Sequence, residues 1–271
     1  MRRRQLLLAA VVGGAGILWG LRAKNSDNGG VHSAYFQTLS NALDKAGLAR
    51  PTLIIDKQKL LANASVLHQH LVGRYDYRVV TKSLPSVPLL EAVMSHTNTQ
   101  RLMVFHQPFL NLIANELPNT DVLLGKPMPV AAAARFYQQH RTTQFDARHQ
   151  LQWLVDSPVR LMQYAELGRQ RGELMLINLE LDVGLHRGGI KSEEQLAVAL
   201  DIIEREPFLQ FSGFMGYDPH VSKNPGLLGG AEAAFSAVQK TYQNFVTIAE
   251  RQLQRSLSGL TLNAAGSPTY Q

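Results

Sequence analysis

The chain has 271 residues, of which 45% are hydrophobic and 18% charged, so it can bury the core of one large α/β domain or two modest ones. It contains no cysteine, which excludes disulfides, thiolate nucleophiles and cysteine metal sites. The formal net charge is +6, but five of the 27 basic residues lie in the first 24 positions, which leaves 22 basic and 21 acidic residues in the rest of the chain. We therefore expect no basic groove for nucleic acid.

The N-terminal segment combines three arginines at positions 2–4 with an uncharged apolar stretch, residues 6–21. This order is typical of an export signal, and the arginines directly before the leucines also resemble a twin-arginine signal. As a helix the stretch would extend about 24 Å, against roughly 30 Å for a bilayer core, so a signal peptide fits better than a permanent span. An uncleaved anchor stays open as the alternative.

We accordingly expect residues 1–35 to be a signal peptide or membrane anchor followed by a linker. The protein would then be exported, either periplasmic or anchored to the inner membrane, and this segment would contact the membrane or the export machinery. Residues 36–271 are expected to form the folded domain.

From residue 51 onward, short apolar segments alternate with longer amphipathic ones. The expected strands are residues 51–56, 77–82, 101–106, 121–126, 151–156, 174–182, 209–217 and 260–266. Helical patterns follow residue 56 and cover residues 193–206 and 231–257. Continuous apolar strands that alternate with helices predict a parallel sheet covered on both faces.

A doubly wound open sheet and a (β/α)8 TIM-type barrel both satisfy this pattern, and two observations favour the barrel. No glycine-rich phosphate loop follows the first strand, and polar or glycine residues stand at the carboxyl ends of many strands. These residues are Lys82, His106, Lys126, Asp156, Asp182, Tyr217 and Gly266. In a barrel the carboxyl ends of all strands face one mouth, where active sites occur.

The segment INLELDVGLHRGGI, residues 177–190, contains the most information about function. It places Arg187 in a glycine-flanked loop after a strand, with the carboxylates of Glu180 and Asp182 nearby to orient it. The planar guanidinium of an arginine holds its N–H donors in a fixed geometry, which suits an oxygen on a planar ligand. On these residues alone, an arginine that is merely salt-bridged within a loop stays open as the alternative.

The pattern E-x-D-x-G-x-x-R-x-G in this segment occurs with PTLIID and VVTKS upstream and GFMGY downstream. This ordered set resembles the pyridoxal phosphate (PLP) barrel of the alanine racemase N-terminal type, over residues 51–271. The likeness is closest to the branch that contains D-threonine aldolase and D-serine dehydratase. The resemblance implies a PLP-dependent barrel of fold type III, with eight strands and a following β-domain.

Seven barrel strands are counted from residue 77, so the resemblance implies a barrel that is incomplete at its C-terminal end, without the β-domain. In the lyase branch a divalent metal belongs to that β-domain. We therefore assign no metal ligand in this chain, including the helical pair His68 and His70, which would point apart.

The resemblance also implies site residues. Lys82 would hold the cofactor as a Schiff base and then serve as an acid or base at the substrate α-carbon. Arg187 would contact the phenolic oxygen of the cofactor ring, and Tyr217 would pack against the ring. The cofactor phosphate would bind the turn after the last strand, through Gly266, Ser267, Thr269 and Tyr270.

His220, in YDPH, is a candidate catalytic acid or base from the residues themselves, because the unperturbed pKa of histidine lies in the working range. A solvent-facing loop histidine is the alternative.

The implied activity is that of a lyase acting on D-amino acids through PLP, similar to D-threonine aldolase or D-serine dehydratase. Three alternatives stay open: an amino-acid racemase, a non-catalytic PLP-binding protein of the homeostasis type, and a sugar- or phosphate-binding barrel without PLP. The expected partners are a small-molecule amino acid substrate and no nucleic acid, with a homodimer left open.

Overall fold

The computed structural model describes residues 29–223, 230–264, 266 and 269, and the chain divides into two units, Met1–Ile55 and Asp56–Gln271. The described part of the first unit contains one helix, α2 (Ala34–Lys45). The predicted domain boundary after residue 35 stays a prediction. No helix among the described residues is long and apolar enough to cross a membrane. The expected export signal lies within residues 1–28, outside the described residues, so export and membrane contact also stay predictions.

The predicted strand at residues 51–56 is wrong. This segment has no regular secondary structure, and Leu53 is 88% exposed. A strand needs a partner for its backbone groups, and none of the described strands pairs with this segment. Asp56 instead begins helix α3 (Lys57–Leu71), because its carboxylate accepts a hydrogen bond from the backbone N–H of Lys59 at 3.0 Å.

The described part of the second unit is built on seven parallel strands that follow one another in chain order across the sheet. They are β1 (Arg78–Val80), β2 (Arg101–Val104), β3 (Asp121–Leu124), β4 (Leu151–Val155), β5 (Met175–Leu181), β6 (Leu209–Gly216) and β7 (Thr261–Asn263). All seven strands expected from residue 77 onward are confirmed. Consecutive order is that of a (β/α) barrel rather than of a doubly wound sheet, so the expectation of an incomplete barrel is confirmed.

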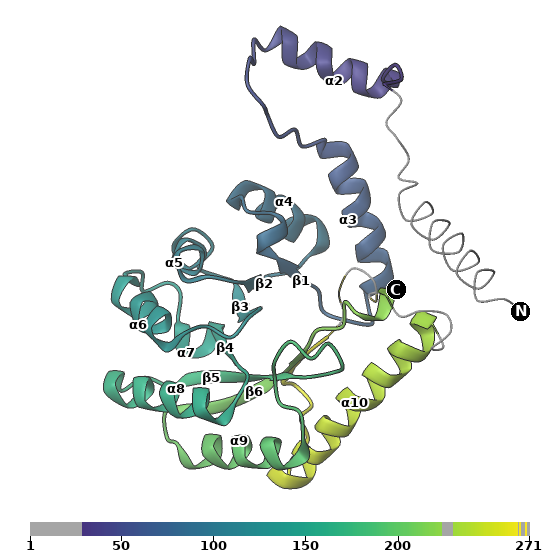
Figure 1. Ribbon diagram of the computed structural model, residues 1–271. Coiled ribbons are helices and arrows are strands. Elements are labelled where there is room, and N and C mark those ends of the chain that lie inside the picture. Colours follow the sequence, from purple (N-terminus) through teal and green to yellow (C-terminus); the bar gives the residue numbers. More distant parts are fainter. Residues whose placement is uncertain (1–28, 224–229, 265, 267–268, 270–271) are drawn as a thin grey trace, which may run out of the picture. The chain divides into compact units, whose positions relative to one another are not determined.

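Helices follow the strands and surround the sheet on its outer side (Figure 1). Beyond α3 they are α4 (Val87–Thr97), α5 (Gln107–Glu116), α6 (Val130–Gln139), α7 (Ala147–Gln150), α8 (Pro158–Arg171), α9 (Glu193–Arg205) and α10 (Gly230–Leu253), with 3₁₀ turns at Thr81–Ser83 and Val221–Lys223. Several begin at a side chain that accepts a backbone N–H of the first turn, as His106, Ser157 and Ser192 do. His106 and Ser157 come two residues after the ends of β2 and β4, so these two caps begin their helices close to the carboxyl ends of the strands.

The hydrophobic core lies between the sheet and the helices. The strands are mostly apolar because both faces of the sheet are buried. Strand β4 is buried along its whole length, and Trp153 on it is fully buried. The indole N–H of Trp153 donates to the hydroxyl of Tyr137 at 3.1 Å, and the hydroxyl of Tyr164 donates to the carbonyl of Met128 at 3.0 Å. The polar atoms of these large side chains are therefore satisfied within the helical layer.

Polar side chains link strands that are not neighbours in the sheet. The amide of Gln152 on β4 donates to the hydroxyl of Thr261 on β7 at 2.8 Å. The amide of Asn178 on β5 donates to the Gln152 side chain at 3.2 Å and to the Thr261 carbonyl at 3.3 Å. Because β7 hydrogen-bonds to β4 across two intervening strands, the sheet is curved as in a barrel, and these three residues lie on its inner face.

Candidate active site

Lys82 is the middle residue of the 3₁₀ turn Thr81–Ser83, which directly follows β1. The hydroxyl of Thr81 donates to the carbonyl of Met103 on β2 at 3.0 Å, which fixes the turn against the sheet. The Lys82 side chain is exposed, and its Nζ lies 4.5 Å from the centre of the Phe105 ring. The predicted cofactor lysine is thus an accessible amine at the carboxyl end of the first barrel strand.

Glu180, Arg187 and Tyr217 form one cluster at the carboxyl ends of β5 and β6. The guanidinium of Arg187 donates to a carboxylate oxygen of Glu180 at 2.7 Å and lies 5.1 Å from the centre of the Tyr217 ring. The Glu180 side chain is only 6% exposed, whereas that of Arg187 is 34% exposed. The Glu180 carboxylate therefore holds one nitrogen of the Arg187 guanidinium, and the other N–H groups of the guanidinium stay accessible.

Asp182 organises the loop that carries Arg187. One oxygen of its carboxylate accepts the backbone N–H of Gly184 at 3.1 Å and that of His186 at 2.9 Å, and the other lies 2.9 Å from Nδ1 of His186. Burial is the largest influence on the pKa of Asp182 and would raise it, but these hydrogen bonds together lower the pKa below its usual range. His186 adopts a positive φ of 55°, which the turn imposes directly before Arg187.

His220 lies beside this loop. A Cβ atom on Gly184, whose φ is +112°, would lie 3.0 Å from Nε2 of His220, so the loop backbone passes directly over the imidazole. Asp182, Gly184, His186 and His220 line a cavity of about 430 Å³ together with residues 233–241 of α10. Nδ1 of His220 is buried and has no hydrogen-bond partner among the described residues. The predicted acid or base is therefore at the mouth, next to the arginine loop.

The predicted phosphate turn is described only in part, because Ser267 and Tyr270 lie outside the described residues. The backbone N–H of Gly266 donates to the hydroxyl of Thr269 at 3.1 Å, and the backbone N–H of Thr269 donates to the carbonyl of Gly266 at 3.0 Å. These groups form a closed turn after β7. Both of these N–H groups are bonded within the turn, so an anion that bound them would have to replace these bonds.

The other polar residues at strand ends have surroundings of their own, although Oδ2 of Asp156 would lie 4.0 Å from a Cβ atom on Gly188, in the loop that carries Arg187. His106 caps α5 through Nδ1, 3.2 Å from the backbone nitrogen of Phe109. Asp156 accepts a hydrogen bond from the hydroxyl of Ser157 at 3.2 Å. Lys126 is exposed after β3. Sequence reasoning did not identify Phe105 and His186 as part of the site, and their positions directly after β2 and directly before Arg187 are the signals that could have done so.

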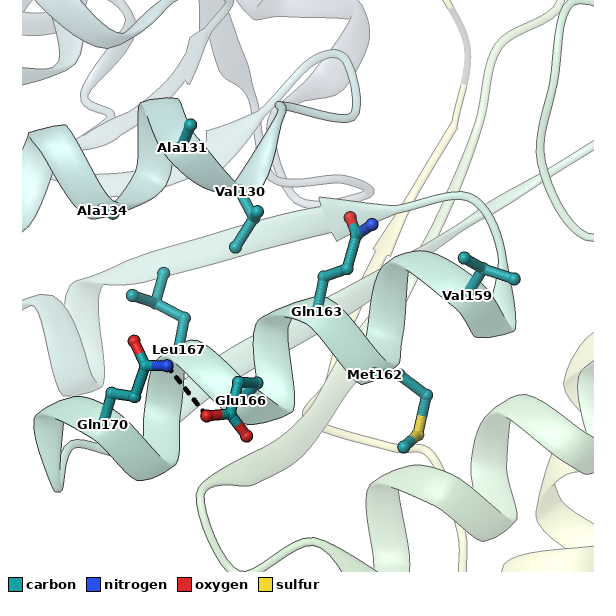
Figure 2. Close-up of a pocket in the computed structure, with 9 residues that line it drawn as sticks. All are labelled: Val130, Ala131, Ala134, Val159, Met162, Gln163, Glu166, Leu167 and Gln170. Atoms are coloured by element: carbon teal, nitrogen blue, oxygen red, sulfur yellow. Dashed lines mark hydrogen bonds between the residues drawn. The ribbon is translucent and has the colours of Figure 1, made fainter.

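A larger groove, of about 580 Å³, lies on the outer wall of the unit between α6 and α8 (Figure 2). Its walls are mainly aliphatic, with Val130 and Ala134 on α6 facing Leu167 on α8. Polar groups in it are engaged with neighbouring side chains, since Gln170 donates to Glu166 at 2.8 Å. Because the described residues that line it include no arginine, lysine or histidine, the groove lacks the chemistry expected of the active site.

A PLP site has to hold three parts of the cofactor, namely the aldehyde, the ring with its oxygen, and the phosphate. The residues at the mouth fit the first two. An accessible amine on Lys82 suits the aldehyde carbon, and the free donors of Arg187 beside the Tyr217 ring suit the oxygen and face of a planar ring. The described residues of the phosphate turn fit less directly, for the reason given above. In the described part of the chain, no group of three or more histidine and acidic side chains could hold a metal ion.

Comparison with solved structures shows the same fold. Alanine racemase from Bacillus anthracis, with bound L-Ala-P, has 14% sequence identity and a TM-score of 0.63; the match covers 82% of this chain and 54% of the racemase. D-threo-3-hydroxyaspartate dehydratase from Delftia sp. HT23 has 19% identity and a TM-score of 0.63, with 82% and 56% covered. Histidine racemase from Leuconostoc mesenteroides has 13% identity and a TM-score of 0.51, with 77% and 49% covered.

The chain thus spans about half the length of these proteins. A comparison with curated proteins found no match. The model of one protein family, described as the N-terminal domain of alanine racemase, matches residues 55–271, which include the whole of the second unit. Together with the parallel barrel strands and the mouth cluster, this match shows that the chain belongs to the alanine racemase N-terminal domain family.

Proposed function

We propose that this chain is the cofactor-binding barrel of a PLP-dependent lyase that acts on D-amino acids with a β-hydroxyl group. Membership of the alanine racemase N-terminal domain family supports a PLP-dependent enzyme of racemase or lyase type. The likeness to D-threo-3-hydroxyaspartate dehydratase supports the lyase branch. The observation that carries the proposal is the Glu180–Arg187 contact at 2.7 Å beside Tyr217, because both charged residues belong to the E-x-D-x-G-x-x-R-x-G pattern by which the sequence resembles the lyase branch.

When bound, PLP would supply an electron sink for the bonds at the substrate α-carbon. The chain itself would supply groups around that carbon. Lys82 would hold the cofactor and afterwards remove or deliver a proton at the α-carbon, because its amine is accessible at the mouth. Arg187, held by Glu180, would orient the ring through its oxygen, and Tyr217 would support the ring.

His220 is proposed as the second acid or base, acting on the β-hydroxyl that leaves or loses its proton. It lines the mouth cavity with Asp182 and His186, and its imidazole lies directly beside Gly184 in the loop that carries Arg187. His220→Gln is expected to reduce turnover of β-hydroxy D-amino acids by about 10²- to 10⁴-fold while PLP binding persists.

The proposal is tested first at Lys82. The protein is mixed with PLP, reduced with borohydride and digested, and the mass of each lysine-containing peptide is measured. The adduct is expected on the peptide that contains Lys82, and it is expected to disappear in Lys82→Ala. Lys126→Ala is the matched control, because Lys126 is also an exposed lysine after a barrel strand. An adduct distributed equally over several lysines, or unchanged in Lys82→Ala, would show that Lys82 is not the cofactor residue.

Product assays then identify the reaction. A lyase is expected to release an aldehyde and glycine from D-threonine, or ammonia and a keto acid from D-serine or D-threo-3-hydroxyaspartate. Racemisation is the second candidate, because alanine and histidine racemases have the same fold as this chain. It would appear as conversion of D-alanine to L-alanine without ammonia. Specific PLP capture by Lys82 without turnover of any of these substrates would instead indicate a binding protein.

A further inference from the structure

Phe105, directly after β2, provides the contact surface for the Lys82 side chain. Nζ of Lys82 lies 4.5 Å from the centre of the Phe105 ring, within the range of a cation–π interaction. Within the described part of the chain, Lys82 forms no ion pair with a carboxylate. The aromatic ring is therefore the interaction that locates this amine in an otherwise exposed position.

Gly125, directly after β3, explains why the ring lies where it does. A Cβ atom on Gly125 would lie 2.4 Å from Cε1 and from Cζ of Phe105, and 2.8 Å from Cγ of Met103. Its φ lies outside the positive range, so a side chain is excluded here by space rather than by backbone conformation. The backbone N–H of Gly125 donates to the carbonyl of Val104 at 2.8 Å, which fixes the glycine to β2.

The carboxyl ends of three neighbouring strands thus form a stack. Gly125 after β3 leaves space for the ring of Phe105 after β2, and that ring lies under the ammonium of Lys82 after β1. A carboxylate in the place of the ring would hold the ammonium more strongly and engage its N–H groups. An aromatic face attracts the ammonium but accepts no conventional hydrogen bond, so it locates the amine without committing its donors.

We propose that Phe105 is a positioning residue for Lys82, and that Gly125 is required because it keeps the Phe105 ring in place. This inference rests on the proposed function, in which Lys82 is the residue that reacts with the cofactor aldehyde. Positioning reduces the number of side-chain rotamers that Lys82 samples, so a larger fraction of the amine lies where the cofactor meets it.

The contact itself is tested without cofactor. Lysines are reductively methylated with ¹³C-formaldehyde, which keeps their positive charge, and the methyl signals are observed by NMR. The signal of Lys82 is assigned by its loss in Lys82→Arg. Methyl groups over an aromatic ring are shifted upfield by the ring current, so the Lys82 signal is expected upfield of the signal of the exposed Lys126. The upfield shift is expected to vanish in Phe105→Leu and to persist in Phe105→Tyr.

The positioning role is tested by PLP capture. Phe105→Leu is expected to weaken the apparent affinity of Lys82 for PLP by about two- to fivefold, because the side chain is then less confined to the place where the cofactor meets it. Phe105→Tyr is expected to restore it. If Phe105→Leu loses the upfield shift but captures PLP as well as the wild type, the positioning role is refuted. If the wild type does not capture PLP at Lys82 at all, the proposed function fails, whereas the NMR result still decides whether the ring locates the amine.

The part assigned to Gly125 has its own test. Gly125→Ala is expected to displace the ring and therefore to reduce both the upfield shift and the affinity for PLP. In the Phe105→Ala background the added methyl meets only the flexible side chain of Met103, so the same Gly125→Ala change is expected to have at most a small effect on the affinity for PLP. Equal effects of Gly125→Ala in both backgrounds would overturn the link between Gly125 and the ring, and circular dichroism of all variants identifies any that fail to fold.

Discussion

Replacing Gly213 with alanine is expected to weaken the pairing of β6 with β7, the last of the described strands. Gly213 lies in β6 with a φ of +141°, which a side chain rarely adopts, and it faces β7 at very short range. A Cβ atom there would lie 2.0 Å from the carbonyl oxygen of Thr261 and 2.7 Å from its carbonyl carbon. These atoms belong to backbone, so the conflict is not relieved by rotating a side chain.

The expected cost has two parts. An L-residue in a disfavoured positive-φ conformation costs about 1–2 kcal/mol, and forcing an extra carbon into a packed interior costs about 1–3 kcal/mol more. Gly213→Ala should therefore lower the free energy of unfolding by about 2–5 kcal/mol, unless the structure avoids the clash by releasing β7. Gly172→Ala is the matched control: Gly172 has a φ of +65° at the end of α8, with open space around its Cβ position, so only the conformational part applies.

Two measurements separate these outcomes. Urea denaturation gives the free energy of unfolding, and hydrogen exchange of the Thr261–Asn263 amides reports the pairing of β7 with β6. We expect faster exchange of β7 in Gly213→Ala but not in Gly172→Ala, with β4 amides unchanged in both. If Gly213→Ala costs no more than Gly172→Ala and leaves β7 exchange unaltered, the close approach of the two strands is refuted.

Three further predictions concern charged groups. Glu180→Gln should weaken PLP binding, measured by fluorescence titration, because Arg187 loses its ionic anchor, whereas the neighbouring fold should keep its circular dichroism. The pKa of Asp182 is lowered in the folded state, so this carboxylate contributes its full stabilisation above the unfolded pKa of about 3.9, and the stabilisation is lost as the pH falls through the folded pKa. Urea midpoints of the wild type should therefore fall in acid, and those of Asp182→Asn should fall less. Asp121→Ala should cost about 1–3 kcal/mol in thermal or urea unfolding, because it leaves the buried guanidinium of Arg78 without its 2.7 Å partner, whereas Arg78→Met should cost less, since Asp121 is 39% exposed and can be hydrated.

Local sequence determined most of the secondary structure. The apolar run at residues 151–156 has the length of one buried strand, and the alternation of such runs with longer amphipathic segments indicated a parallel sheet. The exception is residues 51–56, which have the composition of a strand. A strand also needs a partner, and composition cannot show whether a partner exists, so Asp56 begins a helix there instead.

In the candidate site, too, the sequence indicated one contact but not the others. The spacing of Glu180 and Arg187 within one segment made their contact predictable, because seven residues bridge one strand end and one short loop. The contact between Lys82 and Phe105 joins residues from different strands, and no spacing in the sequence indicates it. His220 next to Gly184 is likewise a contact between separate loops, created when β5 and β6 pair side by side.

The sequence by itself therefore determined the order of the strands and helices, the family likeness, and the residue types at each strand end, since these depend on composition and on periods of a few residues. Only the tertiary structure decided which of these strand ends come together. That choice depends on the curvature of the sheet, which is set by contacts such as that of Gln152 with Thr261, 109 positions apart in the chain. Contacts at such separation are selected by the packing of the whole unit, and the local pattern of either segment contains no information about the other.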